Sequence, residues 1–268
     1  MATAATAIMS PARGCLSSAT ISTLRGDATA LRSKLSSLND FFDLISSSCS
    51  IARLAPGASW SNANQQQFSS VEKTLGIACD TSNAVQAGCG LAQLLTGGLF
   101  FKTNADGTFQ VDPLSKQRIL FSPLSMLSKV TRLASKLLGT VKFMGSPSLP
   151  IYRLGGHAKG IGLAATAFGT VSSAFDVAEN TRDVVETAKQ APSSQEGASK
   201  EASFSARLAN ARKSMFALLC SIFDLLAQAF IFVTEAVSSV FMGVHTAFVV
   251  GIFCFLSALG NILLAVAS

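Results

Sequence analysis

The clearest hydrophobic pattern along the chain is a pair of apolar stretches near its C-terminal end. Met215–Val233 (MFALLCSIFDLLAQAFIFV) and Val240–Leu259 (VFMGVHTAFVVGIFCFLSAL) are separated by the polar segment Thr234–Ser239. A helix needs about 20 apolar residues to cross the roughly 30 Å hydrocarbon core of a bilayer. Each stretch has this length, so the pattern predicts a two-helix membrane hairpin over residues 214–268.

The most strongly polar side chains in these stretches are Asp224, Gln228 and His245. A carboxylate at the centre of a membrane helix costs about 2.5–3.5 kcal/mol, which nearly cancels the gain from the apolar residues of the first stretch. We therefore expect the two stretches to insert as a pair, with Asp224 turned inward. The alternative is a pair of apolar helices buried in a soluble bundle.

The preceding region has a helical pattern that starts at Leu24. Apolar or small residues follow alternating steps of four and three as far as Ala52, as at the a and d positions of a coiled coil. The centre of this seam is formed by Leu31, Leu35, Leu38, Phe42 and Ile45. Two interpretations remain open: a surface for a partner helix, or a helix packed inside the protein's own bundle.

A second helix is predicted after a loop over residues 59–67. The same four-three spacing, with smaller side chains, starts at Val71, and the glycines near Gly97 are expected to end the helix. Beyond it, the segment Asn104-Ala105-Asp106-Gly107 lies between two short apolar segments. This arrangement is typical of a small β-hairpin.

Pro123–Met144 has the pattern of a basic amphipathic helix. One face is apolar, and another carries Lys129, Arg132 and Lys136. Such a helix can lie on an anionic membrane surface, so these three residues are candidate membrane-surface contacts. The alternative is a solvated basic face above an apolar core.

The next part of the chain is rich in small residues. Glycines and alanines in Gly160–Phe175 would let helices approach closely, and a charged helix is predicted over Asp176–Gln190. The predicted organisation is a disordered targeting segment over residues 1–23, a helical body over 24–190, a linker and basic juxtamembrane segment over 191–213, and the hairpin over 214–268. The fold class is therefore mainly α: a helical bundle followed by a two-helix membrane hairpin, with one possible small β-hairpin.

Charge adds an orientation to this picture. The net charge is +6, yet all 21 Lys and Arg residues precede Ser214. The charged residues after Ser214 are the two acids Asp224 and Glu235. Basic residues flanking a membrane segment stay on the untranslocated side. Two spans would then place both termini on that same side. Residues 1–24 lack the apolar core of a secretory signal peptide, so we expect export by another route.

The chain offers little for catalysis or ligand chemistry. The six cysteines form no CxxC pair, and the two histidines, His157 and His245, are isolated. No nucleophile, metal or dinucleotide motif is present, and no aromatic stacking motif for nucleic acid is found. We therefore expect a protein that is not an enzyme and that has no cofactor, no metal and no nucleic-acid partner.

The layout resembles that of the chlamydial inclusion membrane (Inc) proteins. The resemblance rests on the two closely spaced stretches in Ser214–Ser268 and on the acid-free, Ser- and Thr-rich segment Met1–Leu24, which is similar to the start of a type III secretion substrate. It implies an effector that the bacterium secretes and inserts into the membrane of its vacuole, with both termini in the host cytosol. It also implies a host protein partner, with self-association possible.

Two other functions fit the sequence. Met1–Leu24 also resembles a plastid transit peptide, which would make the chain a plastid membrane protein. Pro123–Met144 and the hairpin together could instead permeabilise a membrane or bind lipid. The sequence therefore predicts an integral membrane protein, and leaves its location and partner as hypotheses.

Overall fold

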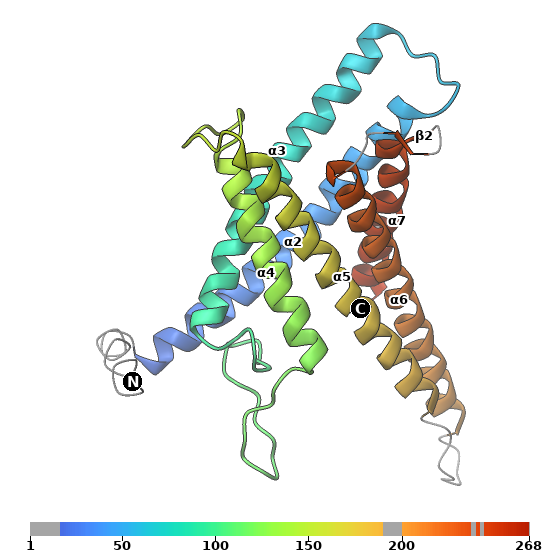
Figure 1. Ribbon diagram of the computed structural model, residues 1–268. Helices are drawn as coiled ribbons and strands as arrows, with labels where there is room; N and C mark the ends of the chain where they lie inside the picture. The colour runs from blue at the N-terminus through green and yellow to red at the C-terminus, as the bar shows by residue number, and fades with distance from the viewer. Residues whose placement is uncertain (1–16, 190–199, 237–239, 242–243, 268) are drawn as a thin grey trace.

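The computed structural model describes residues 17–189, 200–236, 240–241 and 244–267. Within these residues the chain is mainly helical (Figure 1). The helices are α2 (Ser18–Leu54), α3 (Asn62–Leu95), α4 (Pro123–Met144), α5 (His157–Lys189), α6 (Lys200–Ala236) and α7 (Thr246–Ala267). Two strands of two residues, β1 (Val240–Phe241) and β2 (Val244–His245), pair antiparallel between α6 and α7.

The helices form a closed ring. Each helix from α2 to α6 packs against the next in the chain, and α7 packs against both α6 and α2. This differs from the separate body and hairpin that we expected, because α6 lies along α5 and α7 lies along α2. The physical reason is that α6 and α7 carry polar side chains, described below, whose hydrogen-bond partners lie on α5 and α2.

Serine caps set the starts of three helices. The Ser17 side chain accepts a hydrogen bond from the Thr20 backbone N–H (3.1 Å), so α2 begins six residues before the predicted start at Leu24. Ser61 caps α3 in the same way, which places the helix start inside the predicted loop. Ser122 caps α4 and Pro123 follows it, and the predicted bounds Pro123–Met144 are confirmed. Apolar spacing indicates the middle of a helix, whereas the cap decides its end.

The connection between α3 and α4 is held together by one arginine. Gly97 has φ of +78° just after α3 ends, and isolated antiparallel bridges such as Thr103↔Phe109 follow. The predicted β-hairpin is thus present as bridges rather than as regular strands. Arg25 of α2 donates to the Gly107 carbonyl (2.7 Å) and the Thr96 carbonyl (3.1 Å), and it stacks on Phe109.

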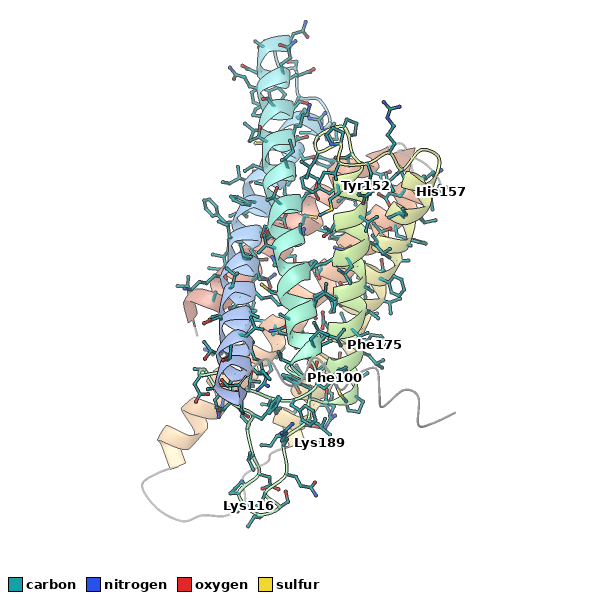
Figure 2. All side chains as sticks on the ribbon, turned by 90° about the vertical axis from the view of Figure 1, so that its left-hand side faces the viewer. Phe100, Lys116, Tyr152, His157, Phe175 and Lys189 are labelled. Carbon is teal, nitrogen blue, oxygen red and sulfur yellow. The ribbon has the colours of Figure 1, made fainter. Side chains whose placement is uncertain are left out.

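The two loops next to α4 lie at opposite ends of the bundle. Figure 2 shows Lys116, in the α3–α4 connection, at one end and Tyr152, in the α4–α5 connection, at the other. The Tyr152 hydroxyl donates to the Val141 carbonyl at the end of α4 (2.5 Å). The long helices between these ends therefore run roughly side by side along the bundle.

Two predicted segments change their bounds. The basic juxtamembrane part of residues 191–213 is not a linker throughout, since α6 already begins at Lys200. The second apolar stretch becomes helical only at Thr246 and continues to Ala267, so His245 precedes the helix and belongs to β2. The predicted targeting segment, residues 1–23, lies outside the described residues except for its last seven positions.

A close contact at a glycine and stacked aromatic rings join the last two helices. A Cβ atom added at Gly260 of α7 would lie 2.3 Å from the Cys220 Sγ atom of α6. Phe253 stacks on Phe223 and Phe230 of α6, at centroid distances of 6.4 and 5.6 Å. α6 and α7 are therefore an antiparallel pair in direct contact.

Polar and apolar residues are distributed inside out across this ring. The largest fully buried side chains among the described residues are Leu99, Gln86, Thr246 and Ser172, three of which are polar. Large apolar side chains are exposed on several helices, including Leu31, Leu38, Leu127, Val130, Met215, Leu219, Ile222 and Leu263. A soluble domain keeps most such side chains inside, so this distribution needs a functional explanation.

Candidate functional site

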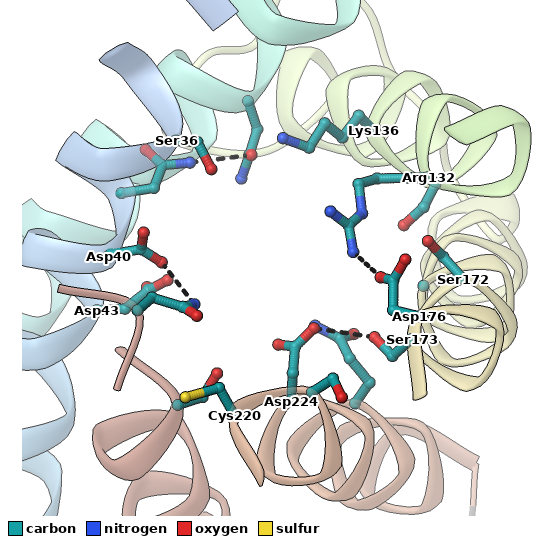
Figure 3. Close-up of a pocket in the computed structure, with 18 of the residues that line it drawn as sticks. Ser36, Asp40, Asp43, Arg132, Lys136, Ser172, Ser173, Asp176, Cys220 and Asp224 are labelled. Atoms are coloured by element: carbon teal, nitrogen blue, oxygen red, sulfur yellow. Dashed lines mark hydrogen bonds and ion pairs between the residues drawn. The ribbon is translucent and has the colours of Figure 1, made fainter. Parts of the chain in front are cut away.

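The ring of helices encloses a polar chamber. Its volume is about 520 Å³, and all six helices contribute to its wall. Figure 3 shows the side chains of the wall pointing toward one central space. The charged residues that line this space are Asp40, Asp43, Asp80, Arg132, Lys136, Asp176, Glu179 and Asp224.

α2 supplies one side of the chamber through a polar stripe. Asn39 donates to the Asn83 side-chain oxygen of α3 (3.1 Å), and Asp40 accepts from the Asn261 amide of α7 (3.2 Å). Asp43 accepts from the Cys79 thiol of α3 (3.6 Å). These contacts connect α2 with both neighbouring helices through polar groups rather than through apolar packing.

α4 and α5 supply the opposite side. Arg132 forms an ion pair with Asp176, and Ser128 donates a hydrogen bond to the same carboxylate (2.5 Å). The Ser172 hydroxyl donates to the Ser128 carbonyl (3.0 Å), and Ser135 donates to the Ala165 carbonyl (2.7 Å). The hydroxyls and small side chains at this contact let α4 and α5 pack closely while their charged groups face the chamber.

α6 completes the wall with Asp224 and Gln228. Asp224 faces inward and accepts a hydrogen bond from the Ser173 hydroxyl of α5 (3.0 Å). A Cβ atom added at Gly169 of α5 would lie 2.9 Å from the Gln228 side-chain oxygen, so a larger residue there would require this amide to shift. The structure therefore brings Asp224 and Gln228 together. His245, the third predicted polar residue, lies outside the helix pair, and its side chain lies outside the described residues.

We expected the basic face of α4 to lie on the surface of the protein, but it points toward the interior of the ring. Arg132 pairs with Asp176, Lys136 donates to the Gln86 side-chain oxygen, and Lys129 lies over the Phe121 ring. The opposite face, with Leu127, Val130 and Val141, is exposed. We therefore correct the membrane-surface hypothesis for Lys129, Arg132 and Lys136, because these side chains face the interior of the ring.

The seam predicted on α2 is divided between two environments. Leu31 and Leu38 are 44% and 42% exposed, and Phe41 beside them is 51% exposed. The other seam residues named above, Leu35, Phe42 and Ile45, are partly buried. The seam is therefore not a buried core stripe, because the inward face of α2 is the polar one.

Sequence reasoning identified Asp224 and Gln228 but missed most of the chamber. The signal that could have revealed it is a stripe of small or polar residues at helical spacing. On α2 this stripe is Ser36, Asp40, Asp43 and Ser47, and on α6 it is Ala217, Ser221, Asp224 and Gln228. The stripe on α2 lies opposite the predicted seam, for which we left open a partner surface or packing inside the bundle. The stripe on α6 includes Asp224, which we expected to face inward.

The chamber has the chemistry of a hydrophilic compartment. Carboxylates outnumber basic groups on its wall, and the rest of the wall is mostly hydroxyl, amide and small side chains. Among the described residues, no three His, Cys, Asp or Glu side chains are close enough together to coordinate a metal ion. The arrangement is suited to holding water and hydrated solutes rather than to activating a nucleophile.

Comparisons with known proteins add no identity to this picture. No family model matches the chain, and no curated protein or solved structure is similar to it.

Proposed function

We propose that this chain is an integral membrane protein that displays a helical interaction surface at the membrane of a pathogen-containing vacuole. The observation that supports membrane insertion most directly is the inside-out polarity of α6. Polar side chains on a membrane helix face the bundle interior, whereas apolar side chains face lipid. α6 follows this rule, because Asp224 lines the chamber and Leu219 and Ile222 are exposed.

The lengths of the helices support insertion as well. Among the described residues, three helices are long and apolar enough to cross a membrane: His157–Lys189, Ala209–Ala236 and Thr246–Val266. The shortest has 21 residues, which corresponds to about 32 Å at 1.5 Å per residue. We propose that α6 and α7 are the membrane anchor, since they are adjacent and the mean hydropathy of each is higher than that of α5.

The proposed location follows from the resemblance to inclusion membrane proteins and from the charge asymmetry. A hairpin of two spans keeps both termini on one side. The basic residues favour that side as the untranslocated one, and the resemblance makes it the host cytosol. α5 is a third candidate span, and an odd number of spans would separate the termini. The side on which each terminus lies therefore distinguishes the two arrangements.

The proposed interaction surface is the outward stripe of α2. Leu24, Leu31 and Leu38 repeat every seven residues, and all three are exposed together with Phe41. A heptad stripe of exposed leucines is the surface that an amphipathic helix of another protein recognises. We propose that this stripe binds a helix of a host protein. A second copy of this chain is the alternative partner.

The experiment is localisation in infected cells of chains tagged at either terminus. Both tags should be reached by antibodies after selective permeabilisation of the plasma membrane, and the protein should resist alkaline carbonate extraction. Import into plastids, extraction by carbonate, or protection of one tag only would each contradict part of the proposal. Leu31→Ser with Leu38→Ser should preserve localisation and abolish proximity labelling of the partner.

A further inference from the structure

A second cavity adjoins the polar chamber at the end where the α3–α4 connection lies. Its volume is about 410 Å³, and it shares Ser36, Arg132, Lys136 and Asp176 with the polar chamber. Residues of α2, α3, α4 and the connecting loop form most of its wall. We call this cavity the basic chamber, because of the charges that it contains.

The basic chamber holds four basic side chains and one carboxylate. The basic residues are Arg32, Lys129, Arg132 and Lys136, and the carboxylate is Asp176. Asp176 already pairs with Arg132. No ion pair to Arg32, Lys129 or Lys136 is found among the described residues. Three basic groups therefore converge on one cavity whose single lining carboxylate, Asp176, is already paired.

Neutral amides hold two of these basic groups in place. Arg32 donates to the Gln93 side-chain oxygen (2.7 Å), and Lys136 donates to the Gln86 side-chain oxygen. Both amides are oriented by a second contact, since Gln93 donates to Thr29 (2.9 Å) and Gln86 donates to Ser82 (3.4 Å). Gln93 and Gln86 are buried, at 6% and 1% exposure. The basic groups are thus positioned by a buried hydrogen-bond network.

A cluster of basic groups raises the free energy of the folded protein unless an anion balances the charge. Enclosed like charges repel one another, and a neutral amide oxygen compensates a cation less well than an anion does. A multivalent oxyanion can accept hydrogen bonds from several cationic donors at once. The hydroxyls of Ser33 and Ser125 on the same wall can donate to the remaining oxygens.

We propose that the basic chamber binds a phosphate group, either as free phosphate or as the phosphomonoester headgroup of a lipid. Arg32, Lys129 and Lys136 are the cationic donors, and Gln86 and Gln93 hold two of them in position. This site is separate from the proposed partner surface on α2 and does not depend on the location of the protein. The ligand supplies the negative charge that balances these cationic donors. The affinity for phosphate should therefore fall steeply when one donor is removed.

The test for free phosphate uses the full-length protein in uncharged detergent. Inorganic phosphate should raise the thermal midpoint saturably above the value in sodium chloride of equal ionic strength. Arg32→Gln should weaken phosphate binding at least tenfold in equilibrium dialysis. Lys34→Gln is the matched control, because it removes an exposed positive charge from the same helix and should leave the affinity unchanged.

A second variant and a second probe keep the result interpretable. Lys129→Gln repeats the test if Arg32→Gln does not melt cooperatively. The Lys129 ammonium lies over the Phe121 ring and forms no ion pair within the described part of the chain. Vesicles of phosphatidylcholine with phosphatidic acid, compared with phosphatidylglycerol at equal surface charge, test the headgroup source. A preference for phosphatidic acid that the variants abolish supports a lipid ligand.

The proposal is overturned by either of two results. One is equal stabilisation by phosphate and chloride together with equal binding to both kinds of vesicle. The other is a phosphate response of the same strength in wild type, Arg32→Gln and Lys129→Gln. Neither result affects the proposed membrane anchor, which carbonate extraction tests separately.

Discussion

At the scale of single residues, the contact between Gly107 and α2 shows how closely the α3–α4 connection is fitted to the bundle. Gly107 is buried and has φ of +79°. A Cβ atom at this position would lie 2.0 Å from the Ser22 carbonyl oxygen. The Arg25 guanidinium then holds the Gly107 carbonyl from the other side (2.7 Å). Together these contacts attach the loop to the start of α2.

We predict that Gly107→Ala destabilises the protein far more than Gly57→Ala does. Both glycines have φ near +80°, so alanine costs about 1 kcal/mol of backbone strain at either site. Only Gly107 has atoms nearby, whereas nothing lies within 4 Å of a Cβ at Gly57. The steric conflict should raise the total cost at Gly107 to about 3 kcal/mol or more. Thermal melts in detergent measure both variants, and equal midpoints would contradict the packing described here.

Two carboxylates of the same loop make its order depend on pH. Hydrogen bonds from the Thr108 hydroxyl and backbone N–H hold the pKa of Asp106 below its ordinary value. Hydrogen bonds from Ser115 and the Leu114 N–H do the same for the pKa of Asp112. A pKa that is lower in the folded state stabilises the loop above the ordinary carboxylate pKa.

We therefore predict that this stabilisation is lost as the pH falls through the lowered folded-state pKa values. The protection of amide hydrogens in residues 102–120, corrected for the pH dependence of intrinsic exchange, should be high at neutral pH and should fall only in acid. Asp106→Asn with Asp112→Asn should flatten this pH profile, while Asp27→Asn, a change on α2 outside the loop, should not. A profile that survives the double substitution would mean that other groups hold the loop.

At the scale of elements, α6 and α4 share one arrangement, in which the polar face is inside and the apolar face is outside. On α6, Ser221 lines the chamber, and Leu219, two residues earlier, is 49% exposed. On α4, Lys136 faces the interior while Val141 is exposed. The spacing of residues is that of any amphipathic helix. What differs is the direction in which each face points.

We predict that Leu219→Lys impairs membrane insertion and that Ser221→Lys does not. A lysine at the lipid-facing position costs about 3 kcal/mol on the insertion scale. A lysine at position 221 would face the chamber, where carboxylates outnumber basic groups. Insertion in a microsomal assay measures both variants. The opposite order, with Leu219→Lys tolerated and Ser221→Lys harmful, is the result expected of a soluble bundle and would contradict our proposal.

At the scale of the whole molecule, the decisive feature is the closure of the ring between α7 and α2. A Cβ atom added at Gly251 would lie 3.6 Å from the Ser50 Cβ atom. The Asn261 amide of α7 also donates to Asp40 of α2 (3.2 Å), across most of the chain. Without this closure, the polar stripe of α2 would have no opposing wall on α7.

We predict that Ser50→Cys with Gly251→Cys forms a disulfide bond under mild oxidation. Cβ separations of about 3.5–4.5 Å suit a disulfide. The experiment requires a background in which the six native cysteines are serine. Ser48→Cys with Gly251→Cys is the control, since Ser48 is exposed on another face of α2. Cross-linking of neither pair would mean that the last two helices stand apart from the body.

Several of these features could be predicted from the sequence, because they depend on neighbours along the chain. The bounds of α4 follow from the cap at Ser122, Pro123 and the apolar spacing that follows them. The end of α3 before Gly97 is likewise a local property. The start of α2 could not be predicted in this way, because Ser17 was assigned to a targeting segment on the basis of composition.

The sequence by itself determined that the chain is mainly helical, that its last two long helices are apolar, and that Asp224 needs an inward partner. Only the tertiary structure decided which face of each helix points inward. Helical periodicity separates a polar face from an apolar one but does not say which of them faces the interior, because that depends on whether water or lipid lies outside. The chamber is assembled from residues such as Asp40 and Asn261, which are 221 positions apart. Pairs at that separation meet only when the ring closes.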